Sequence, residues 1–273
     1  MDKKVFYAKI SRFFYRTTFK PGLYKYKFLR HFDRPAIALR KKFMSHDALI
    51  CLPKQGTIEI GETVRKQDIV LPLAVVDHFI EKANYLAVMN YCICRESNEC
   101  KDYSRNLGCL FMGEAAKGIH PDLCRQVTKE EAREHVRKCR AEGLIQVVGR
   151  AWFDCVWLDI GPHDRLFTVC NCCPCCCITL ATPYLHPEVT DWLHRLPGLN
   201  VLVSDDCIGC GACVKACVYN GVKLEGDRAV ITDECRGCGR CVEACPQKAL
   251  SISIDMNSAR QAIDFLEPRV DVS

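Results

Sequence analysis

The sequence lacks several features that mark common classes of protein. It has no run of 18 or more apolar residues, so no membrane-spanning helix is expected, and residues 1–20 lack the continuous apolar stretch of a secretory signal peptide. No P-loop is present, and no G-x-G-x-x-G stands between a strand and a helix, so nothing indicates a nucleotide or flavin site. The 8 histidines are scattered and form no H-E-x-x-H motif, and no nucleophile–base pair can be identified.

Cysteine, by contrast, is abundant, with 22 residues in a chain of 273. In a small secreted protein this would indicate disulfides, but here the cysteines cluster at C-x2-C spacing and no signal peptide is expected. The thiols are therefore expected to be reduced and to bind metal. This predicts a reducing compartment, the cytoplasm, and a protein that works in an anaerobe or is guarded from oxygen.

The most regular pattern lies between Cys207 and Pro246. It consists of two C-x2-C-x2-C-x3-C motifs, which begin at Cys207 and Cys235, and the second is followed by proline. This spacing is typical of cubane iron–sulfur clusters, in which three thiolates come from one motif and the fourth from the other. Small residues between the cysteines let the backbone pass close to a cluster. The alternative is a pair of all-cysteine zinc sites, which usually show separated C-x2-C pairs rather than triplets.

With these motifs, residues 201–255 resemble the bacterial two-[4Fe-4S] ferredoxin module. Val218 departs from that family, which usually has proline after the first motif. The resemblance implies two sets of ligands that cross over between the motifs. They are Cys207, Cys210, Cys213 and Cys245 for one cluster, and Cys235, Cys238, Cys241 and Cys217 for the other.

A second cysteine-rich region precedes this module. It contains Cys92-Ile93-Cys94-Arg95, then Cys100 and Cys109, and finally the run Cys170-Asn171-Cys172-Cys173-Pro174-Cys175-Cys176-Cys177. Six thiols in eight residues exceed what core packing explains, so we expect a third metal site, either an iron–sulfur cluster or a structural zinc. The expected metal-facing residues are Cys92, Cys94, Cys100, Cys109, Cys170, Cys172, Cys173 and Cys176. The isolated thiols are expected to be buried and structural: Cys51, Cys124, Cys139 and Cys155.

The order of a C-x-C-Arg stretch and a C-N-C-C-x-C-C-C stretch also resembles the amino-terminal half of ferredoxin-containing proteins of anaerobic microbes. That resemblance implies no particular reaction. The predicted fold class is α+β, with a ferredoxin-like two-cluster module after a mixed α/β cysteine-rich domain whose order of elements is winged-helix-like in part. The expected divisions are a basic aromatic-rich extension, the cysteine-rich domain, the ferredoxin domain and a C-terminal tail, at residues 1–42, 43–198, 199–258 and 259–273.

Hydrophobic periodicity and capping signals predict the elements of the cysteine-rich domain. A helix should begin after Thr128, which forms a capping box with Glu131, and should end at Gly143. The other expected elements are a strand at Thr57–Ile60, a helix at Leu71–Ala83, and strands at Tyr85–Tyr91, Leu144–Val148 and Trp152–Leu158.

Residues 1–42 carry most of the positive charge. They hold 13 Lys or Arg against Asp2 and Asp33, and ten aromatic residues are interleaved with these charges. Such a segment predicts docking on an acidic partner or an anionic membrane surface, which would make the protein peripheral to the membrane. Packing of the aromatic residues onto the chain's own domain is the alternative, and nucleic-acid binding is the least favoured interpretation.

Together these patterns predict an iron–sulfur electron-transfer protein that passes single electrons between redox protein partners. We expect it to be a subunit or dedicated partner of an anaerobic oxidoreductase. Three alternatives stay open. These alternatives are a catalytic subunit with an unusual iron–sulfur site at Cys170–Cys177, a redox-sensing regulator that binds DNA, and an assembly factor that transfers a cluster to another protein.

Overall fold

The computed structural model describes Ala38, Lys41 and residues 44–54, 57–60, 63–65 and 71–273. Its largest element is a seven-stranded sheet with the order β6-β4-β5-β8-β7-β1-β9. Neighbouring strands are antiparallel, except for β1 and β9, which are parallel. The strands are β1 (Ala48–Leu52), β4 (Leu86–Met89), β5 (Leu110–Met112), β6 (Cys124–Gln126), β7 (Ile145–Arg150), β8 (Phe167–Cys172) and β9 (Leu193–Arg195).

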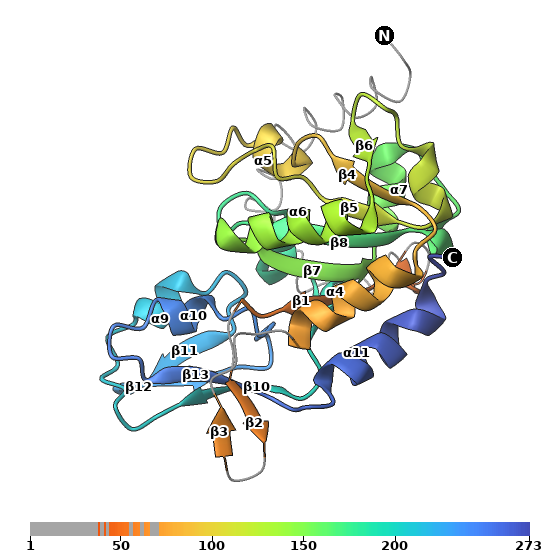
Figure 1. Ribbon diagram of the computed structural model, residues 1–273. Helices are drawn as coiled ribbons and strands as arrows, with labels where there is room; N and C mark the ends of the chain where they lie inside the picture. Colours follow the sequence, from red (N-terminus) through yellow and green to blue (C-terminus); the bar gives the residue numbers. More distant parts are fainter. Residues whose placement is uncertain (1–37, 39–40, 42–43, 55–56, 61–62, 66–70) are drawn as a thin grey trace.

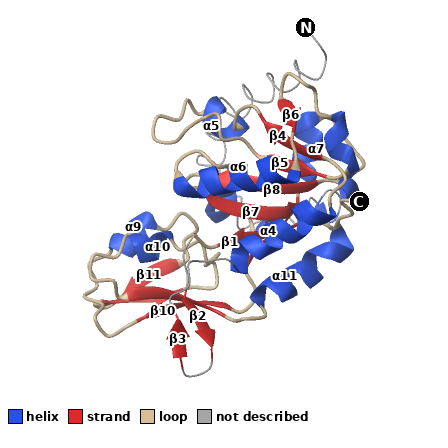
Figure 2. Ribbon diagram, in the orientation of Figure 1, coloured by secondary structure: helices blue, strands red, loops and turns tan. Residues whose placement is uncertain are grey.

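Both faces of this sheet are buried. In β4, Leu86 and Val88 belong to one hydrophobic core, whereas Ala87 and Met89 belong to another, as the two-residue period of a strand requires. The first core is covered by α4 (Leu71–Lys82), α6 (Lys129–Ala141) and α11 (Ser258–Leu266), which cross in front of the sheet (Figure 2). The second core includes residues of η4 (Glu114–Gly118) and α7 (Trp152–Leu158).

The capping box predicted for α6 is confirmed. The Thr128 hydroxyl accepts from the Glu131 backbone N–H at 3.2 Å, and the Glu131 carboxylate accepts from the Thr128 backbone N–H at 2.8 Å. The predicted helix at Leu71–Ala83 and the strands at Thr57–Ile60, Tyr85–Tyr91 and Leu144–Val148 are also confirmed, with small shifts at their ends.

The strand predicted at Trp152–Leu158 is wrong, because these residues form helix α7. A short continuous apolar run carries no period that separates strand from helix. Here tertiary contacts decide, since the Asp47 carboxylate accepts from the Trp152 backbone N–H at 2.8 Å, at the start of the helix. The winged-helix-like order is also not the architecture, because β7 and β8 lie inside the seven-stranded sheet.

The second part of the chain is a small module beside the large sheet (Figure 1). It contains the four-stranded sheet β10-β13-β2-β3 and the hairpin β11-β12. Its elements are β2 (Thr57–Ile60), β3 (Thr63–Arg65), β10 (Leu199–Val203), α9 (Ala212–Ala216), β11 (Val222–Glu225), β12 (Arg228–Ile231), α10 (Arg240–Glu243) and β13 (Leu250–Ile254).

The chain passes between the two parts more than once. Strand β2, from the beginning of the described chain, pairs with β13 in parallel, and α11 returns after β13 to pack against α4. Ala262 and Leu266 of α11 are fully buried in the core of the large sheet. The domain boundaries predicted at residues 198/199 and 258/259 stay predictions, and the basic extension lies almost entirely outside the described residues.

Short elements complete the described chain. None of its helices is both long and apolar enough to cross a membrane. The short elements are α5 (Ile93–Ser97), η5 (His163–Arg165), η6 (Ile178–Tyr184), α8 (Pro187–Thr190) and η7 (Glu267–Arg269).

Candidate metal centres

The first four predicted cluster ligands surround one small cavity. Its wall contains the thiols of Cys207, Cys210, Cys213 and Cys245, and the other lining residues are mostly apolar or glycine. Three of these cysteines come from the first motif and Cys245 comes from the end of the second. The cavity therefore brings together the thiols that the crossed-over pattern requires.

The other four thiols, Cys217, Cys235, Cys238 and Cys241, lie near one another, and Cys238 also packs with residues of the leading domain. Burial and, to a smaller extent, the neighbouring Cys238, Cys235 and Cys217 together raise the pKa of Cys241 to about 12. Burial likewise raises the pKa of Cys238 to about 11, although the backbone N–H and guanidinium of Arg240 oppose this. Buried thiols that disfavour ionisation in this way, Cys235, Cys238 and Cys241, need a cation if they are to become thiolates, and iron meets that need.

Backbone N–H groups point at the sulfurs of both sets. Ala229 donates to Cys207 Sγ at 3.4 Å, Gly237 donates to Cys235 Sγ at 3.4 Å, and Gly221 donates to Cys217 Sγ at 3.1 Å. Such N–H···S bonds stabilise thiolate charge and tune the potential of an iron–sulfur cluster. Both the donor set and its surroundings therefore fit clusters of this kind.

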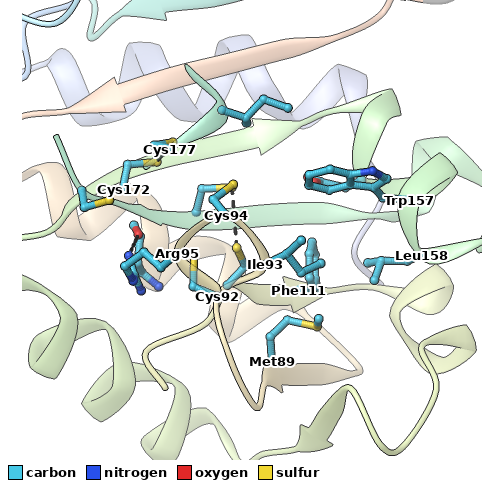
Figure 3. Close-up of a pocket in the computed structure, with 16 residues that line it drawn as sticks. Met89, Cys92, Ile93, Cys94, Arg95, Phe111, Trp157, Leu158, Cys172 and Cys177 are labelled. Atoms are coloured by element: carbon cyan, nitrogen blue, oxygen red, sulfur yellow. Dashed lines mark hydrogen bonds between the residues drawn. The ribbon is translucent and has the colours of Figure 1, made fainter. Parts of the chain in front are cut away.

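The leading domain contains a second thiol-lined cavity, here called the thiol pocket. Seven cysteines line it: Cys92, Cys94, Cys109, Cys170, Cys172, Cys173 and Cys177. Cys92 and Cys94 come from the start of α5, Cys109 precedes β5, and the others come from β8 and the segment after it. Figure 3 shows labelled thiols toward one side of the pocket and the apolar side chains of Trp157 and Leu158 at the other.

Within the thiol pocket the sulfurs approach closely. Cys177 donates to Cys172 Sγ at 3.0 Å, and Cys109 and Cys170 are 3.9 Å apart. Hydrogen bonds from Cys170 and Cys177 lower the pKa of Cys172 well below its ordinary value, and Arg240 and Arg95 lower it further. The surroundings of the Cys172 sulfur therefore favour its anionic form.

Arg95 lies under the thiol pocket and is 0% exposed. Its guanidinium donates to the carbonyl oxygens of Ser104 at 2.8 Å and Asn171 at 2.7 Å, and also to that of Leu107. A buried cation is costly unless anionic groups compensate for it, and the acids that act on Arg95 are the thiols of Cys92, Cys173 and Cys109. The fold thus provides a fixed positive charge for anionic sulfur.

A separate set of four sulfurs lies beside the thiol pocket and is here called the four-thiol group. It consists of Cys100, Cys173, Cys175 and Cys176, whose sulfurs all lie within 4.8 Å of one another. Cys175 Sγ is 3.6 Å from both Cys100 Sγ and Cys176 Sγ. Cys173 borders both the thiol pocket and this group.

The small module touches the wall of the thiol pocket. Arg240, which lies between Cys238 and Cys241, donates to the backbone carbonyl of Cys172 at 2.9 Å. The hydroxyls of Tyr219 and Thr179 are 3.1 Å apart, and Lys54 pairs with Glu243 at 2.7 Å. One buried cluster contains Cys172 and Cys177 from the leading domain together with Tyr219 and Cys238 from the small module.

The structure divides the eight thiols that the sequence predicted for the leading domain between two places. Five line the thiol pocket alone, Cys100 and Cys176 belong to the four-thiol group alone, and Cys173 borders both. Sequence reasoning missed Cys175 and Cys177, whose only signal was their place in the same cysteine run. It also missed the hydrogen bonds by which Arg95 joins the segment after α5 to β8, here called the Arg95 clasp, although Arg95 directly follows the C-x-C pair. The isolated thiols Cys51, Cys124, Cys139 and Cys155 are buried, as predicted.

Comparison with known proteins gives one match. A search of curated proteins and a search of solved structures each found no match. A family model described as a 4Fe-4S dicluster domain matches residues 201–252, which make up most of the small module. Two [4Fe-4S] clusters and an electron-transfer role follow from this domain. Residues 201–252 are therefore a 4Fe-4S dicluster domain, and a cysteine-rich amino-terminal region precedes it.

Proposed function

We propose that this chain is an electron-transfer protein in which the dicluster domain exchanges electrons with a further iron–sulfur cluster in the thiol pocket. One observation carries the proposal. The Arg240 guanidinium, which belongs to the second cluster motif, donates to the carbonyl of Cys172 in the pocket wall at 2.9 Å. The two thiol-rich regions are thus in direct contact, as a path for single electrons requires.

The ligands proposed for the dicluster domain follow the crossed-over pattern. Cys207, Cys210, Cys213 and Cys245 share one cavity, and this supports them as one set. Mutual electrostatic effects among Cys217, Cys235, Cys238 and Cys241 support the other set. Cys238 lies in the same buried cluster as Cys172 and Cys177. The second set is therefore the one next to the thiol pocket.

Thiolate-bound iron–sulfur clusters supply one-electron oxidation and reduction with little structural change. The chain's own residues set the conditions for it. Buried Arg95 and the nearby Arg240 place positive charge beside Cys172, while Tyr219 and the apolar residues of the shared cluster exclude water from the contact. Positive charge favours the more negative reduced state, and low solvent access strengthens that effect.

Iron and acid-labile sulfide content, measured with EPR on anaerobically purified protein, tests the proposal. The dicluster domain accounts for about eight irons and eight sulfides. We expect clearly more sulfide than this in the wild type, and a return to about eight in Cys172→Ser/Cys177→Ser. Cys124→Ser is the matched control, because Cys124 is also buried but is not among the residues that line the pocket. About eight sulfides in the wild type would sink the proposal.

A second candidate, catalysis, is favoured by the shape of the thiol pocket. The cavity continues past the thiols to Phe111, Trp157 and Leu158, and the Asp154 side chain also lines it. A small apolar molecule would therefore meet both a cluster and an acid–base group. Consumption of a candidate small-molecule oxidant by the reduced protein in the absence of any protein partner would support this candidate, and its loss in Trp157→Ala would place the reaction in the pocket.

Docking through the basic extension is a further part of the proposal. The charge of residues 1–42 favours an acidic redox partner or an anionic membrane surface, and this segment precedes the described domains. Reversal of Lys3, Lys4, Lys9 and Arg12 to glutamate should weaken binding to vesicles of anionic lipid and reduce its dependence on salt. Unchanged binding in sedimentation assays would refute this role.

A further inference from the structure

We propose that the four-thiol group binds a single divalent metal ion, Zn²⁺ or iron, as a tetrathiolate site that stands apart from every iron–sulfur cluster of this chain. The group is formed by Cys100, Cys173, Cys175 and Cys176. This inference does not depend on the cluster proposed for the thiol pocket. It assigns a structural metal to the edge of that pocket.

The spacing of the sulfurs carries the assignment. A metal–sulfur bond of about 2.3 Å in a tetrahedron places the sulfurs about 3.8 Å apart. The observed separations are 3.6 Å for Cys100 and Cys175 and 3.6 Å for Cys175 and Cys176, and all four sulfurs lie within 4.8 Å. In a cubane cluster the four thiolates bind four different irons and point away from one another, so a set of four sulfurs that all lie within 4.8 Å of one another does not fit a cubane. The four-thiol group therefore suits one ion.

The chain needs a link at this place. Residues 98–109, between α5 and β5, form twelve residues without helix or strand, beside α5 (Figure 2). Loops of this length are seldom ordered without support of their own. Cys100 lies in this loop, whereas the other three thiols follow β8. A bound ion would join the two segments and, with them, the α5 thiols and β8 thiols of the pocket.

Neighbouring polar groups already hold the same two segments together. The Asn98 amide donates to the carbonyls of Cys94 at 2.7 Å and Cys176 at 3.4 Å. The Cys173 sulfur accepts from the Cys176 backbone N–H at 3.3 Å. Backbone N–H groups of Tyr103 and Asp102 also donate to the Cys100 sulfur. The backbone N–H groups that donate to Cys173 and Cys100 stabilise anionic sulfur in the geometry that a bound ion requires.

Charge is also compensated at this site. Four thiolates and a divalent cation leave a charge of about −2. The buried Arg95 guanidinium lies within electrostatic reach of Cys173 and contacts the 98–109 loop through the carbonyls of Ser104 and Leu107. Its positive charge therefore offsets part of the charge of the proposed site, in the same way that it serves the thiol pocket.

The test measures zinc, iron and sulfide in the full chain, purified anaerobically after production in zinc-supplemented medium. A cubane cluster contains iron and sulfide in equal amounts, so a single ion adds metal without sulfide. We expect about one metal equivalent above sulfide in the wild type. Cys175→Ser should lose that equivalent and keep its sulfide. Cys139→Ala, a buried thiol of the same hydrophobic cluster outside the four, should keep both.

X-ray absorption at the zinc edge of the wild type needs no variant and guards against misfolding of Cys175→Ser. Four sulfur neighbours at about 2.3 Å support the site. Three results would each overturn the proposed site. They are wild-type protein with no metal in excess of sulfide, zinc that is bound by nitrogen or oxygen, and a Cys175→Ser variant that loses about four sulfides. Sulfide content decides the Cys172→Ser/Cys177→Ser experiment, whereas metal in excess of sulfide decides this one, so failure of the proposed pocket cluster is distinguishable from failure of this site.

Discussion

Replacement of Arg95 by lysine offers the sharpest test of how the thiol-rich region is held together. Lysine keeps the positive charge beside the thiols but has a single ammonium group in place of the planar guanidinium fork. The fork donates to the carbonyls of Ser104 and Leu107 in the 98–109 loop and to the carbonyl of Asn171 in β8. Each of the three guanidinium nitrogens donates to a different carbonyl, and a single ammonium nitrogen can take the place of only one of them, so two carbonyls should lose their donor.

The expected cost follows from these bonds. A hydrogen bond from a charged donor contributes about 1.5–3 kcal/mol, so two lost bonds cost about 3–6 kcal/mol before any water enters. Because Arg95 has 0% exposure, little relief by water is expected, so the cost should be at least about 3 kcal/mol, the lower end of this range. Each 1.4 kcal/mol is about a factor of ten in an equilibrium constant, so local opening should become at least about 100-fold more frequent.

Hydrogen–deuterium exchange with mass spectrometry measures this opening directly. Peptides that cover residues 98–109 and β8 should exchange at least about 100-fold faster in Arg95→Lys, while the iron and sulfide of the dicluster domain stay unchanged. Arg137→Lys is the matched control. Arg137 pairs with Glu134 at 3.0 Å on the surface of α6, where a pair contributes about 0.5 kcal/mol or less. Equal exchange in wild type and Arg95→Lys would refute the clasp.

Three further predictions concern the dicluster domain and the large sheet. Arg240→Gln should lower a cluster potential by tens of millivolts, because it removes a positive charge that favours the reduced state; about 1.4 kcal/mol corresponds to about 59 mV for one electron. A redox titration followed by EPR measures this shift. Lys223→Gln, which removes the same charge from β11, is the control and should show no such shift. Gly209→Ala should reduce the cluster content, because the added Cβ would lie 2.7 Å from the Asp227 backbone. Gly226→Ala is the control: Gly226 also has a positive φ, but the space around it is open, so this variant should retain its iron. Equal iron content in both variants would contradict the steric argument. Burial raises the pKa of Asp47 from 3.8 to about 6, so ionisation of Asp47 lowers the stability of the folded state as pH rises from about 4 to about 6. Asp47→Asn removes this ionisation, so the Tm that it gains should be larger at about pH 7 than at about pH 4. An equal gain in Tm at both pH values would argue against the raised pKa.

The elements of the large sheet show how far local patterns reach. The periodicity of α4, the capping box of α6 and the apolar run of β4 are local signals, and each is enough to identify its element from the amino-acid sequence. Trp152–Leu158 is the exception, because apolar residues in succession fit either element and the contact with Asp47 lies far away in the sequence. Pairing of β1 with β7 and β9 likewise depends on partners about 100 and 145 residues away.

The sequence alone identifies the cysteines of the dicluster domain, whereas the grouping of the cysteines in the leading domain depends on the fold. Spacing by itself identified the dicluster domain, because a cubane loop is local and three of its four ligands lie within seven residues. The leading domain has no such local rule, since its thiols meet only after α5, β5 and β8 come together. Tertiary structure alone separated the thiol pocket from the four-thiol group, placed Arg95 beneath them, and brought Arg240 against Cys172. Distances between side chains from distant segments are set by packing, and no sequence pattern encodes them.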